Sequence, residues 1–150
     1  FEEQIQAGNI AVSPGSRSII AVDAGSACTI DFMRENSIYI GGMILPGISA
    51  FINSLKAVAP ELPDTELKFP SSRIGKSTEE SLLHGRLSFF AHGIAGIFES
   101  LRIDFSGAEV FITGGDSNYL VEYLKKKIFV RPNLVLEGLS KILIHNVNEK

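Results

Sequence analysis

The sequence predicts a layered α/β domain with an antiparallel hairpin region at one end. Two observations predict it. Three short apolar segments separated by turn residues open the chain, and helical patterns then alternate with two further short strands. A length of 150 residues suits one domain with a sizeable core. Hydrophobic residues make up 45% and charged residues 21%, which is typical of a globular protein and excludes intrinsic disorder.

Charge and cysteine content exclude several classes of protein. The formal net charge is −3, and the only cluster of basic residues is Lys125–Lys127, so we expect no nucleic-acid partner. The single cysteine, Cys28, excludes an internal disulfide and a Cys-rich zinc site. No apolar run reaches about 18 residues and no signal peptide opens the chain, so we expect no membrane partner and a cytoplasmic location.

Three strands are expected near the start. Residues 1–18 are polar and are interpreted as a tail or the end of a preceding helix, with the domain itself spanning residues 19–150. Apolar and β-branched residues then predict strands, and clusters of Gly, Ser and Asn predict the turns between them. The expected strands are Ser18–Val22, Ala27–Met33 and Ile38–Ile40, the last ending at Gly41 and Gly42.

A helix and a long loop follow these strands. Pro46 suits the first turn of a helix, because its fixed φ is helical and its missing N–H is not needed there. Helical spacing joins the apolar residues Ile48, Phe51, Ile52, Leu55 and Val58. Residues 59–76 are expected to form a loop of a length that is usually functional.

The longest helix is expected from Ser77 to about residue 102. Ser77 and Glu80 fit a capping box. Gly85, Gly93 and Gly96 weaken a helix, so their presence indicates close packing against another element. The expected apolar face consists of Leu82, Phe89, Phe90, Ile94, Ile97, Phe98 and Leu101.

The rest of the chain alternates strands with helices. Glu109–Thr113 and Ile128–Val130 are expected to be strands. Between them, Asp116 is expected to cap a helix that runs to Lys127, whose lysines complement the negative end of the helix dipole. The residues from Leu134 to about Asn146 predict a final helix, or a strand followed by a helix.

Two turns could bind phosphate. The turn within Asp23–Thr29 offers backbone N–H groups and hydroxyls, and Asp23 at a strand end could hold a cation. Thr113–Asp116 lies between a strand and a helix, where α/β sheets collect ligands, and its two glycines allow close approach. Taken alone, each is also explained as an ordinary turn with a capping aspartate.

A third motif resembles a Walker A loop without being one. Gly75–Thr78 reproduces the end of that loop, but the required first glycine is replaced by Pro70. We therefore reject a P-loop NTPase. The motif still places Lys76, Ser77 and Thr78 at a helix N-terminus, which attracts anions or polar ligands.

The histidines and the cysteine indicate little chemistry. His84 and His92 are too far apart on a helix to share one metal ion, and both are interpreted as packing or surface residues. His145 is expected to be exposed to solvent, and Cys28 is interpreted as a small buried strand residue.

Taken in order, several blocks of the sequence resemble the type III pantothenate kinases. The resemblance runs from about residue 19 to residue 144 and is more specific than any one motif. The blocks are Val22–Ala27, Thr29–Asp31, Tyr39–Gly47, Ile74–Thr78, Thr113–Asp116 and Pro132–Leu139.

The resemblance implies a ribonuclease H-like/actin-like ATPase domain, one half of the two-domain acetate and sugar kinase/Hsp70/actin fold with ATP in the cleft. It implies ATP-dependent phosphorylation of pantothenate, the first step of coenzyme A biosynthesis, with Mg²⁺ and K⁺ or NH₄⁺, in a homodimer whose active site lies near the subunit interface. Matched residue by residue, Asp23 would bind the monovalent cation, Thr78 would contact pantothenate, and the ATP contacts would be Gly25, Ser26 (where the family usually has Thr), Gly114 and Gly115.

The chain also departs from the family pattern. The family's N-terminal domain, with its first phosphate loop and a Gly-x-Asp-Arg segment that carries the general-base aspartate, has no match in these 150 residues. We therefore expect the C-terminal half of a kinase, inactive alone, with the catalytic aspartate in the missing part. The alternative is a non-catalytic regulatory or binding relative of the same fold. A sugar or acetate kinase is a third hypothesis, which the blocks at Pro46-Gly47 and Gly75–Thr78 do not favour.

Overall fold

The computed structural model describes residues 17–34, 38–69, 74–101, 104–122, 124 and 128–148. Within them, five strands form one mixed sheet in the order β3-β2-β1-β4-β5. β1 pairs with β2 antiparallel and with β4 parallel, β2 and β3 are antiparallel, and β4 and β5 are parallel. The strands are β1 (Ile19–Ala24), β2 (Ala27–Arg34), β3 (Ile38–Pro46), β4 (Glu109–Thr113) and β5 (Ile128–Val130). The α/β domain with an antiparallel region at one end is thereby confirmed.

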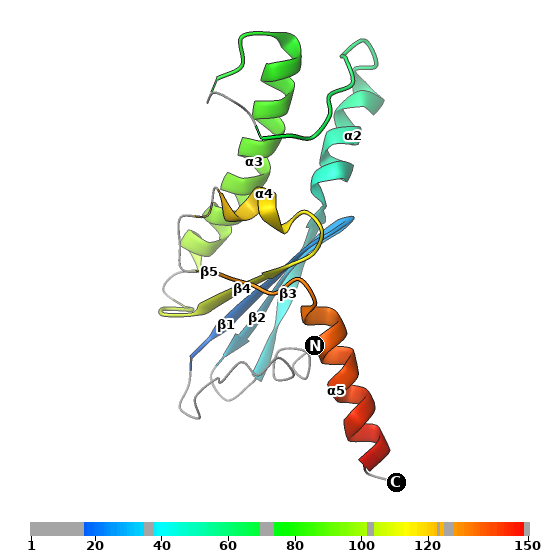
Figure 1. Cartoon of the computed structure of the whole chain (residues 1–150). Helices are drawn as coiled ribbons and strands as arrows, with labels where there is room; N and C mark the ends of the chain where they lie inside the picture. Colours follow the sequence, from blue (N-terminus) through cyan, green and yellow to red (C-terminus); the bar gives the residue numbers. More distant parts are fainter. Residues whose placement is uncertain are drawn as a thin grey trace.

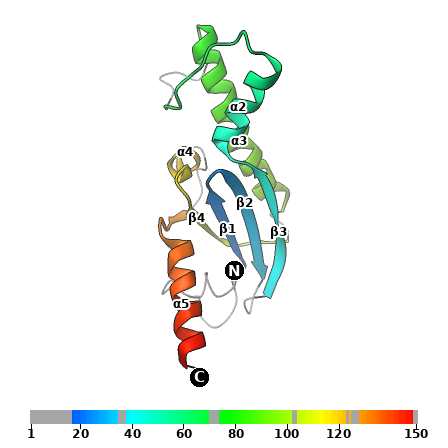
Figure 2. The same ribbon diagram turned by 90° about the vertical axis from the view of Figure 1, so that its right-hand side faces the viewer.

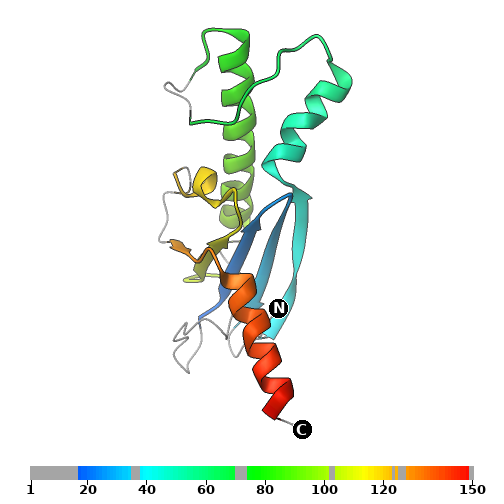
Figure 3. The same ribbon diagram turned by 45° about the vertical axis from the view of Figure 1, so that its right-hand side comes forward.

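The helices extend from opposite ends of the sheet (Figure 1). They are α2 (Ile48–Val58), α3 (Thr78–Ser100), α4 (Ser117–Val121) and α5 (Leu134–Asn148). α2 and α3 project together beyond one end of the strands, and α5 leaves the sheet at the other end (Figures 1 and 3). None of the described helices is long and apolar enough to cross a membrane.

The main core lies on one face of the sheet. Alternate residues of β1 and β2 point to this face because successive strand side chains alternate. They pack with buried residues of α3, among them Leu87, Ile94 and Phe98. A smaller cluster on the opposite face consists of Ile19, Ala21, Met33, Phe111 and Leu134.

The start of α3 has the predicted cap with one variation. The Oγ of Ser77 accepts a hydrogen bond from the backbone N–H of Glu80 at 3.2 Å. The Glu80 carboxylate accepts from the N–H of Lys76, one residue before the cap, at 2.7 Å. In the standard capping box it would accept from the cap residue itself.

β3 is longer than predicted. Gly41 and Gly42 do not end the strand, which continues to Pro46. Gly41 has φ +134° and lies beside an irregularity in the β2–β3 register, between Phe32 and Met33. Pro46 is therefore the last strand residue and not the first helical one, and Gly47 is the N-cap of α2.

Three other predictions were wrong in detail. The helix after Asp116 ends at Val121, and the Asp116 side chain makes no capping hydrogen bond. A Cβ at Gly85, Gly93 or Gly96 would meet no atom within 4 Å, so these glycines do not pack closely against the described part of the chain. Phe89 is 68% exposed, although its ring stacks on that of Phe51 at a centroid distance of 5.1 Å.

The final segment is a helix throughout, with no strand in Leu134–Asn148. Cys28 and His84 are buried and His145 is exposed, as expected. His92 is exposed and its Nδ1 lies 2.7 Å from the carbonyl oxygen of Ser88. Residues 1–16 of the expected tail and the lysine cluster Lys125–Lys127 lie outside the described residues.

Candidate functional site

The structure brings together two candidate turns that are distant in the sequence. β1 and β4 are parallel neighbours, and Asp23 is paired with Thr113 where the two strands end. The backbone N–H of Asp116 donates to the carbonyl oxygen of Ala24 at 2.9 Å. The β1–β2 turn and the Thr113–Asp116 turn therefore form one corner of the sheet, at the strand ends where α/β proteins bind ligands.

Glycines allow the backbone to pack tightly at this corner. Gly114 has φ +93°, and a Cβ there would lie 2.3 Å from the carbonyl oxygen of Ala24 and 2.6 Å from Oδ1 of Asp23. On the other side, a Cβ at Gly47 would lie 2.1 Å from the carbonyl oxygen of Gly25. The N–H of Gly47 also donates to the carbonyl oxygen of Ser26 at 3.2 Å. The turn is thus held from two directions.

Two residues of the corner remain open to solvent. Ser26 is exposed at the tip of the β1–β2 turn. Gly115 is exposed, and a Cβ there would meet nothing within 4 Å. A ligand could therefore approach both residues without displacing protein atoms.

Negative charge gathers on the face of the sheet that carries Asp23. Asp23, Thr29 and Asp31 share this face because they alternate with the core residues of β1 and β2. Burial raises the pKa of Asp23, and the charge of Asp31 raises it further. Burial also raises the pKa of Asp116. Ionised carboxylates here are therefore costly, and a bound cation would offset that cost.

Asp31 and Tyr39 were not proposed as site residues from the sequence. Asp31 accepts hydrogen bonds from the hydroxyl of Thr29 at 3.1 Å and from that of Tyr39 at 3.0 Å. Thr29 and Asp31 alternate along one strand, beside the strand that carries Asp23. This alternation is the sequence signal that could have identified Asp31.

The donor set at this corner consists of oxygen atoms, which suit a hard cation. One partly buried carboxylate with neighbouring hydroxyl oxygens is the oxygen-only environment that such hard cations take. Within the described ranges, no group of three or more His, Cys, Asp or Glu side chains could hold a metal ion by itself. A divalent ion would therefore need ligands from elsewhere, such as phosphate oxygens.

The buried thiol of Cys28 is not part of this chemistry. Burial raises its pKa to about 11, with the charges of Asp23 and Asp116 as lesser causes. A thiol that stays protonated at neutral pH is a poor nucleophile.

Thr78 does not join the corner within one chain. It is the first residue of α3, and that end of α3 lies beyond the sheet, near the end of α2 that is distant from the strands (Figures 1 and 3). Thr78 is exposed, and the cap of the helix is Ser77.

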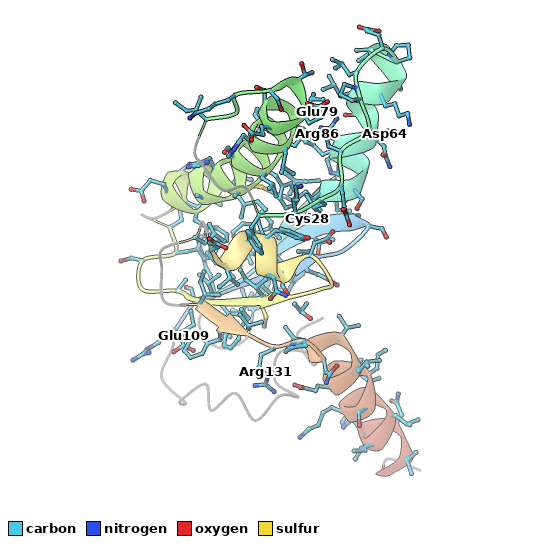
Figure 4. The ribbon with its side chains drawn as sticks, turned by 45° about the horizontal axis from the view of Figure 1, so that its top comes forward. Cys28, Asp64, Glu79, Arg86, Glu109 and Arg131 are labelled. Carbon is cyan, nitrogen blue, oxygen red and sulfur yellow. The ribbon has the colours of Figure 1, made fainter. Side chains whose placement is uncertain are left out.

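The first half of α3 also holds a buried, positively charged side chain that the sequence analysis did not predict. Arg86 lies on the buried side of α3, and its Nη1 donates to the hydroxyl of Thr65 at 2.6 Å (Figure 4). Its Nε is buried and has no hydrogen-bond partner among the described residues. The only sequence signal is helical spacing, which places Arg86 beside the buried residues Leu83 and Leu87.

Comparison with known proteins decides the family. The sequence model described as "Type III pantothenate kinase" matches residues 6–100. The chain belongs to the type III pantothenate kinase family. Two curated type III pantothenate kinases, from Flavobacterium johnsoniae and Flavobacterium psychrophilum, are each 35% identical over 86% and 92% of this chain. The chain matches 53% and 57% of their lengths, so it spans about half of the curated relatives.

Solved structures of other proteins share the fold of this chain. A structure described as a conserved candidate Baf family transcriptional activator from Campylobacter jejuni is 27% identical, with a TM-score of 0.64 over 97% of this chain and 65% of that one. An activator of 2-hydroxyisocaproyl-CoA dehydratase from Clostridium difficile, with bound ADPNP, has a TM-score of 0.55 at 14% identity. The latter shows the fold alone, and together they confirm the actin-like ATPase fold implied by the sequence resemblance.

Proposed function

We propose that this chain supplies the C-terminal half of a type III pantothenate kinase, which transfers a phosphoryl group from ATP to pantothenate in the first step of coenzyme A biosynthesis. The observation that carries the proposal is the corner where Asp23, the β1–β2 turn and Gly114 meet, in a chain of this family. The other half of the kinase would be an N-terminal domain that closes the cleft over ATP. The whole enzyme is proposed to act in the cytoplasm.

The two turns at the corner are proposed to hold the phosphates of ATP. Ser26 offers an exposed hydroxyl, and the backbone of Gly25 lies beside it. Gly114 and Gly115 carry no side chain that would keep a nucleotide away from the backbone. Mg²⁺ would arrive on the phosphate oxygens, because the corner offers it too few ligands of its own.

Asp23 is proposed to bind the monovalent cation, K⁺ or NH₄⁺. Its burial and the nearby charge of Asp31 make a positive neighbour favourable. Such an ion would supply fixed positive charge next to the phosphates, where phosphoryl transfer spreads negative charge.

The reaction requires one proton transfer and one exchange of P–O bonds. The primary hydroxyl of pantothenate gives its proton to a general base, and its oxygen forms a bond to the γ-phosphorus while the bond to the leaving oxygen of ADP breaks. The base is proposed to be an aspartate of the N-terminal domain. Within this chain, Thr78 is proposed to orient pantothenate through its exposed hydroxyl.

A homodimer is part of the proposal. The start of α3, whose first residue is Thr78, lies well away from the end of β1 that carries Asp23 (Figure 3), so one chain does not bring the two contacts to one substrate. A dimer whose active sites lie near the subunit interface gives Thr78 a way to serve the site of a partner.

A kinase assay tests the proposed function. The isolated chain should show no measurable ATP- and pantothenate-dependent ADP release, since loss of a general base alone costs about 10²–10⁴-fold. Joined to the part of the Flavobacterium johnsoniae kinase that it does not match, it should phosphorylate pantothenate in the presence of K⁺ or NH₄⁺. K⁺-dependent turnover by the isolated chain would contradict the proposal.

The competing function is a non-catalytic binding or regulatory protein of the same fold. If the joined protein binds ATP but phosphorylates no pantothenate, this alternative holds. In the joined protein, Asp23→Asn removes the carboxylate proposed to bind the cation. Asp64→Asn is its matched control, because Asp64 is an exposed carboxylate whose partner is Lys56, away from the corner.

A further inference from the structure

α5 carries apolar residues on two opposite sides. On one side, Leu134 is 4% exposed and packs in the smaller cluster of the sheet. On the other side, four apolar residues recur at spacings of three, four and four, within about 80° of the helix circumference. This α5 stripe consists of Leu136, Leu139, Leu143 and Val147, which are 65%, 51%, 65% and 64% exposed.

The charged residues of α5 lie on the same side of the helix as Leu134, opposite the α5 stripe. Glu137, Lys141 and His145 follow one another at intervals of four, and Glu137 is paired with Arg131 at the start of the helix. An ordinary surface helix has one apolar side and a polar remainder. α5 instead buries Leu134 on its charged side and exposes the apolar stripe on the opposite side, so it has surfaces for two packing partners.

Only one of these partners is seen in the described part of the chain. Figures 1 and 2 show α5 leaving the sheet and extending away from it, with no other described helix alongside. From Leu136 to Val147 the stripe is about 16 Å long. Exposed apolar surface of this extent marks an interaction site.

We propose that the α5 stripe docks on the additional domain of the full-length kinase, an inference that rests on the two-domain organisation proposed above. The known relatives are nearly twice as long as the region that this chain matches, so they contain enough further chain to cover it. The Campylobacter jejuni structure likewise has about a third of its length outside the match.

The position of α5 favours this domain over a second copy of the chain. Leu134 packs with Ile19 and Ala21, which alternate along β1 on the same face of the sheet as Asp23. α5 therefore flanks the face that carries the candidate nucleotide site. A single domain placed against this face would cover the stripe and also complete the cleft over ATP.

A shallow hollow beside the stripe offers the docked domain a further contact surface. It has a volume of about 400 Å³ and is lined by Asn133, Leu136, Glu137, Ser140 and Lys141. Its apolar wall continues the stripe, and its charged wall fits a polar rim, which is the usual anatomy of an interface.

Thiol labelling tests the proposal. Cys28 is fully buried and its pKa is raised to about 11, so it provides a silent background. Leu143→Cys puts a thiol on the stripe, and His145→Cys is the control, at an exposed position on the charged side and outside the hollow. In the isolated chain both new thiols should react rapidly with a maleimide, at rates independent of protein concentration.

The two thiols should differ once the chain is joined to the unmatched part of the Flavobacterium johnsoniae kinase. Labelling at position 143 should slow by about tenfold or more, while labelling at position 145 changes by less than about twofold. Equal, rapid labelling in a joined protein that melts cooperatively would overturn the proposal. Slow, concentration-dependent labelling of position 143 in the isolated chain would also overturn it, in favour of a second copy.

A second variant keeps the test valid if the joined protein folds poorly. In the isolated chain, the double change Leu139→Ser and Leu143→Ser should leave Tm within about 2 °C, because both side chains are more than half exposed among the described residues. A larger fall would show that the stripe is covered within the chain and would contradict the proposal. Pantothenate turnover is a separate readout. A joined protein that is active but labels rapidly at position 143 refutes only the docking. A joined protein that is inactive but labels slowly at position 143 refutes only the proposed function.

Discussion

Oδ1 of Asp23 lies 2.6 Å from the point where a Cβ at Gly114 would stand. The two residues belong to the ends of parallel neighbouring strands, and the close approach leaves no room for any side chain at position 114. The positive φ of Gly114 adds a second reason, because L-residues rarely adopt it.

Gly114→Ala should therefore destabilise the chain. Backbone strain and the steric clash together cost about 2–5 kcal/mol, which lowers Tm by about 5–15 °C. Gly115→Ala is the matched control, since a Cβ there meets nothing, and its Tm should change by less than about 2 °C. Thermal unfolding followed by circular dichroism measures both. Equal values of Tm for the two variants would mean that the corner is not tightly packed.

Asp23→Asn should stabilise the isolated chain at neutral pH. Burial and Asp31 raise the pKa of Asp23, so its ionised form destabilises the folded state at every pH above the folded pKa. This destabilisation is relieved as the pH falls through the folded pKa and is gone below the unfolded value of 3.8. The Tm of the variant should exceed that of the wild type by a few degrees at pH 7 and by less as the pH falls.

The same substitution should have the opposite effect on the complete kinase. Loss of the carboxylate charge should lower activity and flatten its dependence on K⁺ or NH₄⁺, while Asp64→Asn leaves that dependence intact. Titration of both salts at constant ionic strength measures it. An unchanged response in Asp23→Asn would remove this residue from the cation site.

Ser77→Ala and Thr78→Val should separate capping from substrate binding. Ser77 supplies the cap of α3, so its loss should cost about 0.5–2 kcal/mol and lower Tm by about 2–6 °C. Thr78→Val should leave Tm within about 2 °C but raise the KM for pantothenate, and not that for ATP, by a few-fold to about tenfold in the complete kinase. Unchanged values of KM in Thr78→Val would show that Thr78 does not contact pantothenate.

Gly93→Ala should stabilise the isolated chain. Nothing lies within 4 Å of a Cβ at this helical position, so the gain in helix propensity of about 0.5–1 kcal/mol should raise Tm by about 1–4 °C. Gly85→Ala provides an independent repeat on the same helix. A fall in Tm that grows with protein concentration would instead show that another molecule packs on this side of α3.

Most element positions could be predicted because their signals are local. The apolar runs of β1, β2, β4 and β5, and the helical spacing of α2, are contained in a few neighbouring residues. The length of β3 was missed because Gly41 and Gly42 resemble a stop signal. In the sheet a Cβ at Gly42 would lie 2.6 Å from Oδ1 of Asp31, so this glycine permits a close strand contact that only the tertiary structure reveals.

The site was predictable in its parts and not in its assembly. Asp23, Ser26 and Gly114 were selected from turn motifs, but their proximity depends on the parallel pairing of β1 with β4. Asp31 was missed as a neighbour of Asp23 because its role depends on the β1–β2 register. The distance between Thr78 and Asp23 depends on how far α2 and α3 project beyond the sheet, which no local pattern encodes.

The central position of β1 also affects how the chain is made. β1 must pair with β4, and the paired residues begin with Ile19 beside Glu109. Both α2 and α3 are synthesised after β1 and before β4. At about 5–20 residues per second, a ribosome needs several seconds to deliver β4 after β1 has emerged. During this interval the inner edge of the β1–β2 hairpin has no partner strand, and this edge is where a nascent chain would recruit a chaperone or pair with a neighbour on the same polysome.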